Sequence, residues 1–251
     1  MSYFLFAVAS SMTQNCADGS IFCMIGEKQT QTLLCNLMSN VFQHMAAPVP
    51  SSFFVDKHLT TNCDVPIKLI SSLQNKRLGY SIDLKDKPLQ SRSLNLITGG
   101  EKISFKRRNC SSKTELRITT KMFIFCSKLP KLDQINEAIR QRTKIIKFCS
   151  CFNGSPEHVQ QNRIDSSLID VIPRDLDYIK GFMVLLIEKL KELKSNNYKL
   201  PHQDSKENAY FKLTSLQEEK SLEIFLLKNV TSCPGSFISF EDMLARFMPG
   251  F

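Results

Sequence analysis

The stretch that decides the fold is SIFCMIGEKQTQTLLCNLMSNVFQH, residues 20–44. Residues 20–25 form a continuous apolar run that ends at Gly26, and such a run predicts a buried strand. From Thr32 to His44 the apolar residues recur at helical spacing, with Thr30 or Thr32 as a cap near the start. The stretch therefore predicts strand, loop and helix, a repeating unit of layered α/β domains.

The pattern of strand and helix continues up to residue 153. Pro48 and Pro50 end the first unit, and we expect a loop around Phe53 and Phe54 to follow. Strands interleaved with helices favour an α/β layered domain with a mainly parallel central sheet. Further strands are predicted at 76–83, 102–105, 116–119, 122–126 and 143–148, and further helices at 4–12 and 66–73.

The composition of the sequence changes at Asn153, where glycine, serine and proline introduce a polar stretch, so we expect the α/β core to end there. Residues 154–251 are predicted to be helical. Leu176 to Leu193 carries one apolar stripe with lysines and glutamates opposite, which predicts an amphipathic helix packed against the core. Short helical segments are predicted at 221–228, 231–235 and 240–247.

Composition indicates the class of partner. The 251 residues are 42% hydrophobic, enough for a substantial core, and 33 Lys and Arg against 24 Asp and Glu give a net charge of +9. This excess favours a polyanionic partner. The nine cysteines are odd in number and never form a Cys-x-x-Cys pair, which predicts reduced, intracellular thiols. We expect no membrane span, because no apolar stretch reaches the roughly 18 residues that a span requires.

The most basic segment is Lys106-Arg107-Arg108, which follows the sequence TGGE at 98–101. Its position predicts a turn between two strands, where cations can grip a phosphate backbone. Phe105 is the one aromatic residue beside these cations, so we expect sequence-independent backbone binding of single-stranded DNA more than base stacking. The alternative is a charged hairpin tip whose cations keep it soluble.

Six segments occur in an order that resembles the ATPase domain of superfamily 3 helicases, most similar to the primase-helicases of poxviruses and related large DNA viruses. The resemblance spans Tyr3 to Phe152. It implies a P-loop, AAA+-like core at residues 1–153, and a helical region with a truncated winged-helix-like tail at residues 154–251. The segments are FLFAVASS (4–11), SIFCMIGEKQTQTLLCNLM (20–38), QNKRLGYSIDL (74–84), LNLITGGEKISFKRRN (94–109), KMFIFCSKLP (121–130) and EAIRQRTKIIKFCSCF (137–152).

The resemblance implies ATP and Mg²⁺ as cofactors, held by a phosphate loop at residues 26–32. Gly26 would let the backbone approach the phosphates, Lys28 would neutralise them, and the Thr32 hydroxyl would hold Mg²⁺. Matching Thr32 to that position places Thr30 where a lysine is expected. Asp83, at the end of a predicted strand, would be the acid that coordinates Mg²⁺ and activates water, although it also suits a plain turn with Asp86.

Two further catalytic positions follow from the resemblance. Ser127 occupies the place of the polar sensor between nucleotide and water. Arg142, or less favourably Arg140, would reach the phosphate of a neighbouring subunit in a homo-oligomeric ring, although it also suits a cation on a solvated face. For the basic hairpin the resemblance implies single-stranded DNA binding by Lys102, Lys106, Arg107 and Arg108.

The expected function is that of a helicase-like protein of viral DNA replication, acting at the replication site in the host cytoplasm or nucleus. ATP-driven unwinding is the activity that the resemblance implies. We expect impaired hydrolysis here, because the loop keeps a single glycine, the acid is an aspartate and the sensor is a serine. Two alternatives stay open: a non-catalytic DNA-binding or ring-subunit relic of such a helicase, and a purely structural interaction protein.

Overall fold

A computed structural model describes residues 2–13, 19–56, 69, 71–84, 87–100, 102–106, 113–133, 137–148 and 168–202, together with the single residues 230, 239 and 242. Its centre is a sheet of five strands in the order β2-β3-β6-β1-β7, and every neighbouring pair is parallel. The predicted α/β layered domain with a mainly parallel sheet is therefore confirmed. The strands are β1 (Ile21–Ile25), β2 (Ala46–Pro48), β3 (Leu78–Ser81), β6 (Lys121–Cys126) and β7 (Thr143–Lys147).

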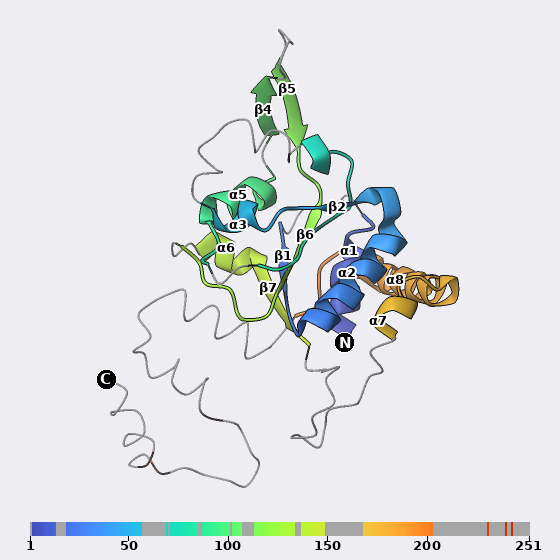
Figure 1. Ribbon diagram of the computed structural model, residues 1–251. Helices are drawn as coiled ribbons and strands as arrows, with labels where there is room; N and C mark the ends of the chain where they lie inside the picture. The colour runs from blue at the N-terminus through green and yellow to red at the C-terminus, as the bar shows by residue number, and fades with distance from the viewer. Residues whose placement is uncertain are drawn as a thin grey trace.

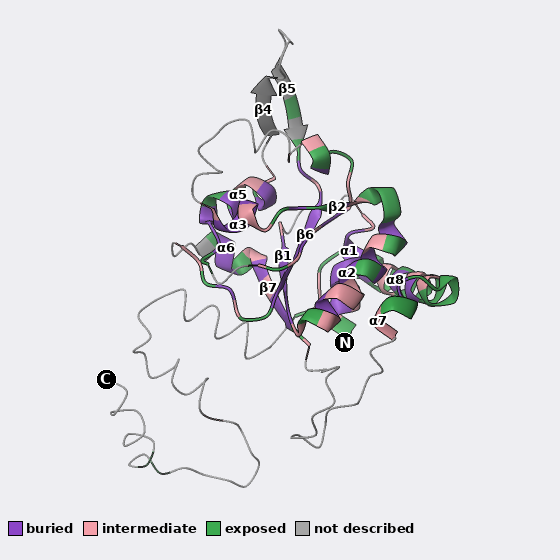
Figure 2. Ribbon diagram, viewed as in Figure 1, coloured by how far each residue is buried: buried purple, intermediate pink, exposed green. Residues whose placement is uncertain are grey.

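The central strands are buried on both faces, as parallel strands between two helical layers have to be (Figure 2). All five residues of β1 and all six of β6 are buried. Alternation along β1 sends Ile21 and Cys23 into one hydrophobic cluster and Phe22 and Met24 into the other. The apolar run in residues 20–25 is therefore explained by burial from both sides.

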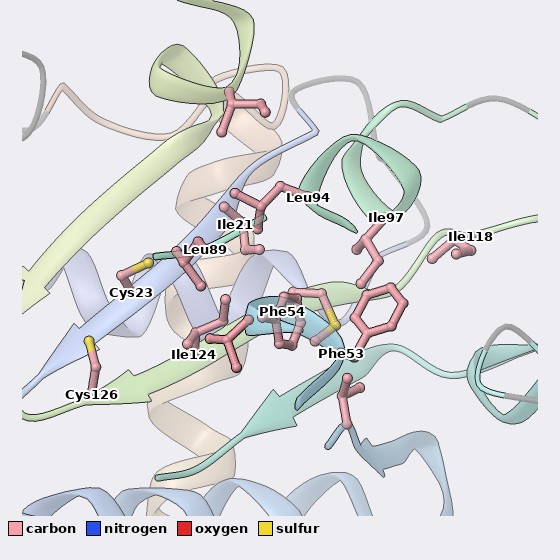
Figure 3. Packing of buried hydrophobic residues seen from close by; sticks show 14 of the residues in the cluster. Ile21, Cys23, Phe53, Phe54, Leu89, Leu94, Ile97, Ile118, Ile124 and Cys126 are labelled. Atoms are coloured by element: carbon pink, nitrogen blue, oxygen red, sulfur yellow. The ribbon is translucent and has the colours of Figure 1, made fainter. Parts of the chain in front are cut away.

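Helices cover both faces of the sheet (Figure 1). On one face lie α3 (Ser52–Val55), α5 (Ser91–Thr98) and α6 (Glu137–Arg142), whose apolar residues surround Phe53 and Phe54 (Figure 3). The other face is covered by α1 (Ser2–Ser10), α2 (Lys28–Phe42) and α8 (Leu176–Ser195). Two short elements complete the described part of this layer, the 3₁₀ turn η1 (Gln43–Met45) and α7 (Leu168–Val171).

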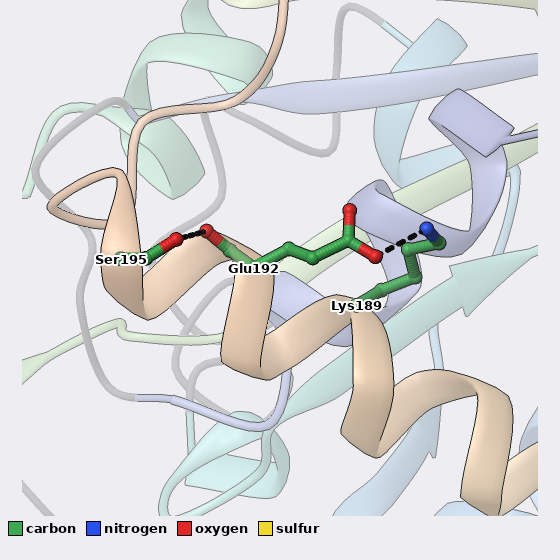
Figure 4. A network of polar contacts seen from close by, with 3 residues as sticks. All are labelled: Lys189, Glu192 and Ser195. Carbon is green, nitrogen blue, oxygen red and sulfur yellow. Dashed lines mark hydrogen bonds and ion pairs between the residues drawn. The ribbon is translucent and has the colours of Figure 1, made fainter.

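Helix α8 packs against the N-terminal helix, as its apolar stripe predicts. Its N-cap Asp175 accepts a hydrogen bond from the Asp177 backbone at 2.8 Å, and Phe182 stacks on Phe4 of α1. Lys189 of α8 lies over the Phe6 ring of α1 and pairs with Glu192, whose backbone carbonyl accepts from the Ser195 hydroxyl (Figure 4). The three short helices predicted after residue 220, and the domain boundary predicted at residue 153, lie outside the described residues and stay predictions.

Several predicted boundaries were wrong. Helix α2 begins at Lys28 with Glu27 as N-cap, so neither Thr30 nor Thr32 caps it. The stretch around Phe53, predicted as a loop, is the short helix α3, because burial of its two phenylalanines draws it into the core. Strand β5 covers Lys113–Arg117 instead of 116–119, because it pairs in register with β4 (Lys102–Lys106).

The antiparallel pair β4–β5 forms a sheet of its own, inserted between α5 and β6. Figure 1 shows this hairpin projecting from the body of the molecule, away from the five-stranded sheet. Among the described residues, no helix has the length and apolar character needed to cross a bilayer.

Candidate functional site

The order of the strands brings three of the predicted site residues to one edge of the sheet. Parallel strands end on the same side, and Gly26, Asp83 and Ser127 follow the carboxyl ends of β1, β3 and β6. Strands β1 and β6 are neighbours in the sheet, but the chain runs from β1 to β2 in one direction across the sheet and from β6 to β7 in the other. Such a reversal opens a crevice at the carboxyl ends, the usual ligand position in open α/β sheets.

Only Gly26 and Glu27 separate β1 from α2. The Gly26 backbone N–H donates to the Cys126 carbonyl at 3.2 Å, which continues the ladder between β1 and β6. Gly26 does not use the left-handed backbone region, and a Cβ there would lie 3.4 Å from the Cβ of Phe148, which is close but not a severe overlap. The loop is a tight turn in which glycine is not required by backbone conformation.

The other loop residues lie in the first turns of α2. Lys28 is exposed at the first helical position, and Thr30 is buried. The Thr32 hydroxyl donates to the Lys28 carbonyl at 2.9 Å, within the same helix. The hydroxyl expected to hold Mg²⁺ is therefore engaged by the backbone of its own helix in this conformation.

Sequence reasoning missed one residue of this candidate site, the buried Gln31. Its Nε2 donates to the Gly26 carbonyl at 2.7 Å and to the Ser127 hydroxyl at 3.4 Å. In a phosphate loop the lysine directly precedes the Ser or Thr, so matching Thr32 puts Gln31, and not Thr30, in the lysine position. The position of Gln31 directly before Thr32 is the feature of the sequence that could have identified it.

Ser127 and Asp83 both lie at the carboxyl edge and are exposed. Ser127 is the first residue after β6 and accepts the Gln31 amide. Asp83 follows β3 by two residues and has a φ of 55°. Aspartate enters this left-handed region more readily than most residues, and here the turn ends the strand and directs the chain toward Leu84.

Arg142 lies at the opposite edge of the sheet. It is the last residue of α6 and directly precedes β7, so it sits at the amino end of that strand. Its Nη1 donates to the Thr98 hydroxyl at 3.5 Å, and Arg140 on the same helix is buried. The structure does not bring Arg142 to Gly26 and Ser127, so its predicted role toward a neighbouring subunit stays a prediction.

Two of the four predicted DNA-binding residues lie on the projecting hairpin. Lys102 and Lys106 are the end residues of β4, whereas Arg107 and Arg108 lie outside the described residues. The register pairs Lys102 with Arg117 and Lys106 with Lys113 on β5. Lys113 and Arg117 were missed because the predicted strand began at Leu116, which hid their alignment with β4.

The edge around Gly26 does not fit a Mg²⁺-triphosphate complex in this conformation. A two-residue turn leaves no loop to surround phosphates with backbone amides, and a neutral amide, Gln31, stands in the lysine position. Within the described part of the chain, no three His, Cys, Asp or Glu side chains gather to hold a metal ion. This conformation does not support the predicted binding of ATP and Mg²⁺. Their binding at Gly26, Lys28, Thr30, Thr32 and Asp83 stays a prediction for experiment.

No protein-family model and no curated protein matches the sequence. Among solved structures, the chain is similar to the A form apo structure of the C-terminal region of NrS-1, residues 305–718, with a TM-score of 0.52 and 16% sequence identity. The two share a fold. The likeness covers 92% of this chain and 54% of that one, so the chain spans about half the length of the structure it matches. At this identity no residue role carries over.

Proposed function

We propose that this chain is a DNA-replication protein that binds single-stranded DNA through the β4–β5 hairpin, on a helicase-like fold with impaired ATP hydrolysis. The observation that carries the proposal is the hairpin itself. It projects from the sheet and pairs Lys102 with Arg117 and Lys106 with Lys113 (Figure 1). Two pairs of cationic positions therefore lie at the two ends of a ribbon that projects from the body of the molecule.

The register of β4 and β5 places these four positions on the same face of the hairpin. Residues directly opposite each other in an antiparallel pair lie on the same face, and so do positions two and four apart along a strand. The positions of the two cation pairs are thus on one face of the ribbon, roughly 14 Å apart at about 3.4 Å per residue. A row of this kind suits successive phosphates of an extended strand, with no reading of base sequence.

The setting in replication rests on weaker support of two kinds. The fold is similar to the C-terminal region of NrS-1, and the segments between Tyr3 and Phe152 resemble superfamily 3 helicases. A homo-oligomeric ring at a viral replication site belongs to this proposal. In such a ring Arg142, at the amino end of β7, is the residue proposed to reach the phosphate of a neighbouring subunit.

Fluorescence anisotropy of a labelled oligo-dT, titrated at several salt concentrations, tests the proposal. The variant Lys106→Ala/Arg107→Ala/Arg108→Ala should lose at least about tenfold in affinity, because three phosphate contacts are removed. The matched control replaces Lys180, Lys191 and Lys194, three exposed cations of α8, by alanine and should bind like wild type. Equal binding by the hairpin variant and wild type would reject the hairpin as the DNA site.

A nucleotide-driven helicase is the second candidate, favoured by the convergence of Gly26, Asp83 and Ser127 at one edge of the sheet. ATP hydrolysis stimulated by single-stranded DNA and abolished in Lys28→Ala would establish it in place of the non-catalytic protein. Hydrolysis absent under the conditions where DNA is bound would leave the first proposal standing.

A further inference from the structure

A cavity of about 540 Å³ opens at the carboxyl edge of the sheet, beside the Gly26–Thr32 loop but separate from it. Its lining comes from two walls, Leu84, Lys87 and Pro88, which follow β3, and residues 126–131, which follow β6. Its described lining includes Ser127 and no residue of the Gly26–Thr32 loop. The cavity is therefore distinct from residues 26–32, and Ser127, which accepts from Gln31, lies at its border.

The backbone explains why the walls stand apart. At one end the Leu84 N–H donates to the Phe125 carbonyl at 3.5 Å, and at the other the Leu89 N–H donates to the Lys131 carbonyl at 2.7 Å. Between these two junctions each wall contains a proline, Pro88 and Pro130, which has no N–H to give across the gap. The cavity is thus built into the path of the chain.

The lining carries positive charge from both walls. Lys87 comes from one wall, and Lys128 and Lys131 come from the other, while none of the described lining residues is acidic. The Asp56 carboxylate lies 3.7 Å from Lys87, but both side chains are well exposed and such a pair neutralises little. Asp133, two residues after Lys131, accepts from the Ser91 N–H and hydroxyl and is engaged at the start of α5.

We propose that this cavity binds a small phosphate-bearing anion, either inorganic polyphosphate or the phosphate chain of a nucleotide. Its volume lies in the range of roughly 300–1,000 Å³ that small-molecule sites occupy. Lysine ammonium groups bind phosphate as point charges with little demand on geometry. The Ser127 hydroxyl can donate to a phosphate oxygen while it accepts from Gln31. The site uses no residue of the β4–β5 hairpin and goes beyond the proposed DNA binding.

Isothermal titration of the full chain at low salt with tripolyphosphate, ATP and adenosine tests this site. The double variant Lys128→Ala/Lys131→Ala should weaken tripolyphosphate binding at least about tenfold, because two charge-assisted contacts are lost. Both lysines are exposed, so the fold should be kept, and Lys128→Arg/Lys131→Arg should retain binding.

Two controls separate this site from its surroundings. Lys28→Ala changes the first residue of α2, and Lys191→Ala/Lys194→Ala removes a matched pair of exposed charges from α8. Each variant should change the affinity for tripolyphosphate less than about twofold. Equal affinity for tripolyphosphate and ATP with none for adenosine assigns the site to phosphate alone, whereas tighter ATP binding assigns it to a nucleotide. No binding by wild type, or a loss in Lys28→Ala that the double variant does not share, would overturn the proposal.

Discussion

Gln31 donates a hydrogen bond from its side-chain amide to the hydroxyl of Ser127 across 3.4 Å, although the two residues are 96 positions apart in the chain. The same amide nitrogen donates to the Gly26 carbonyl at 2.7 Å. One side chain therefore ties the start of α2 to the loop that follows β6. A neutral amide thus joins the two strand ends where the resemblance predicts a phosphate-binding cation.

Replacing Gln31 by alanine should lower the free energy of unfolding by about 1–2 kcal/mol, because the buried amide and its two hydrogen bonds are lost together. Urea denaturation followed by circular dichroism measures this change. The matched control is Thr32→Ala, the next residue on the same helix. The Thr32 hydroxyl donates to the Lys28 carbonyl within the same helix, so we expect its loss to change the free energy of unfolding by less than about 0.5 kcal/mol. Equal midpoints for Gln31→Ala and wild type would show that the bridge contributes nothing to stability.

Gly181→Ala should stabilise the protein by about 0.5–1 kcal/mol. Gly181 lies inside α8 and is exposed, its φ is not positive, and a Cβ would meet no atom within 4 Å. The substitution therefore removes conformational freedom from the unfolded chain without disturbing the folded one. A rise in the thermal unfolding midpoint is the expected result.

Gly19→Ala serves as the opposite case in the same experiment. Gly19 has a φ of +53°, and a Cβ there would lie 2.6 Å from the Thr98 carbonyl oxygen. Both strain and overlap should lower stability by more than about 1 kcal/mol. If both alanine variants shifted the midpoint in the same direction, the backbone conformations assigned to these glycines would be wrong.

The sheet could be predicted from sequence because its central strands are buried from both sides. The continuous apolar runs at 20–25 and 122–126 predict strands that are buried on both faces, and they coincide with β1 and β6 to within one residue. Strand β2 was missed because it is three residues long and ends at Pro48, where a proline usually signals a break. Its position at the edge of the sheet explains why the proline is tolerated there.

The candidate site was predictable in its position but not in its contacts. Strand ends could be read from the sequence, and they place Gly26, Asp83 and Ser127 at one edge. The bond between Gln31 and Ser127 could not be read, because it depends on β6 lying beside β1 and on α2 starting after a two-residue turn. The cavity beside Ser127 depends likewise on two loops that meet only in the folded chain.

Stability should fall as pH rises above 9, because burial raises the pKa of three thiols, those of Cys23, Cys35 and Cys126. Burial raises the pKa of Cys35 and of Cys126 from 9.0 to about 12. The folded state keeps these protons at pH values where the unfolded chain has lost them. The contribution of each thiol is therefore complete below pH 9 and declines between 9.0 and about 12. The decline is about 1.4 kcal/mol per pH unit for each thiol.

Urea unfolding at pH 8, 9 and 10 measures this dependence, with Cys126→Ala as the comparison. Lysine and tyrosine side chains also titrate in this range, but they are common to both proteins, so the difference in slope reports the thiol. The variant should lose less stability between pH 9 and 10 than wild type, by roughly 1 kcal/mol. Parallel curves would mean that the Cys126 thiol ionises as easily in the folded chain as in the unfolded one.

Substitution of two exposed residues of β5, Arg117 and Glu115, should change the affinity for single-stranded DNA in opposite directions. Arg117 is opposite Lys102 and Glu115 is opposite Ser104, so both positions lie on the cationic face of the hairpin. Arg117→Ala should weaken oligo-dT binding and reduce the slope of log K against log salt by about 0.7, the value for one phosphate contact on a single strand. Glu115→Gln should strengthen binding by roughly twofold to threefold, because it removes a repulsive charge from the same face. The check is a salt titration of both variants beside wild type. A shift of the same sign in both would place the DNA on a different surface of the protein.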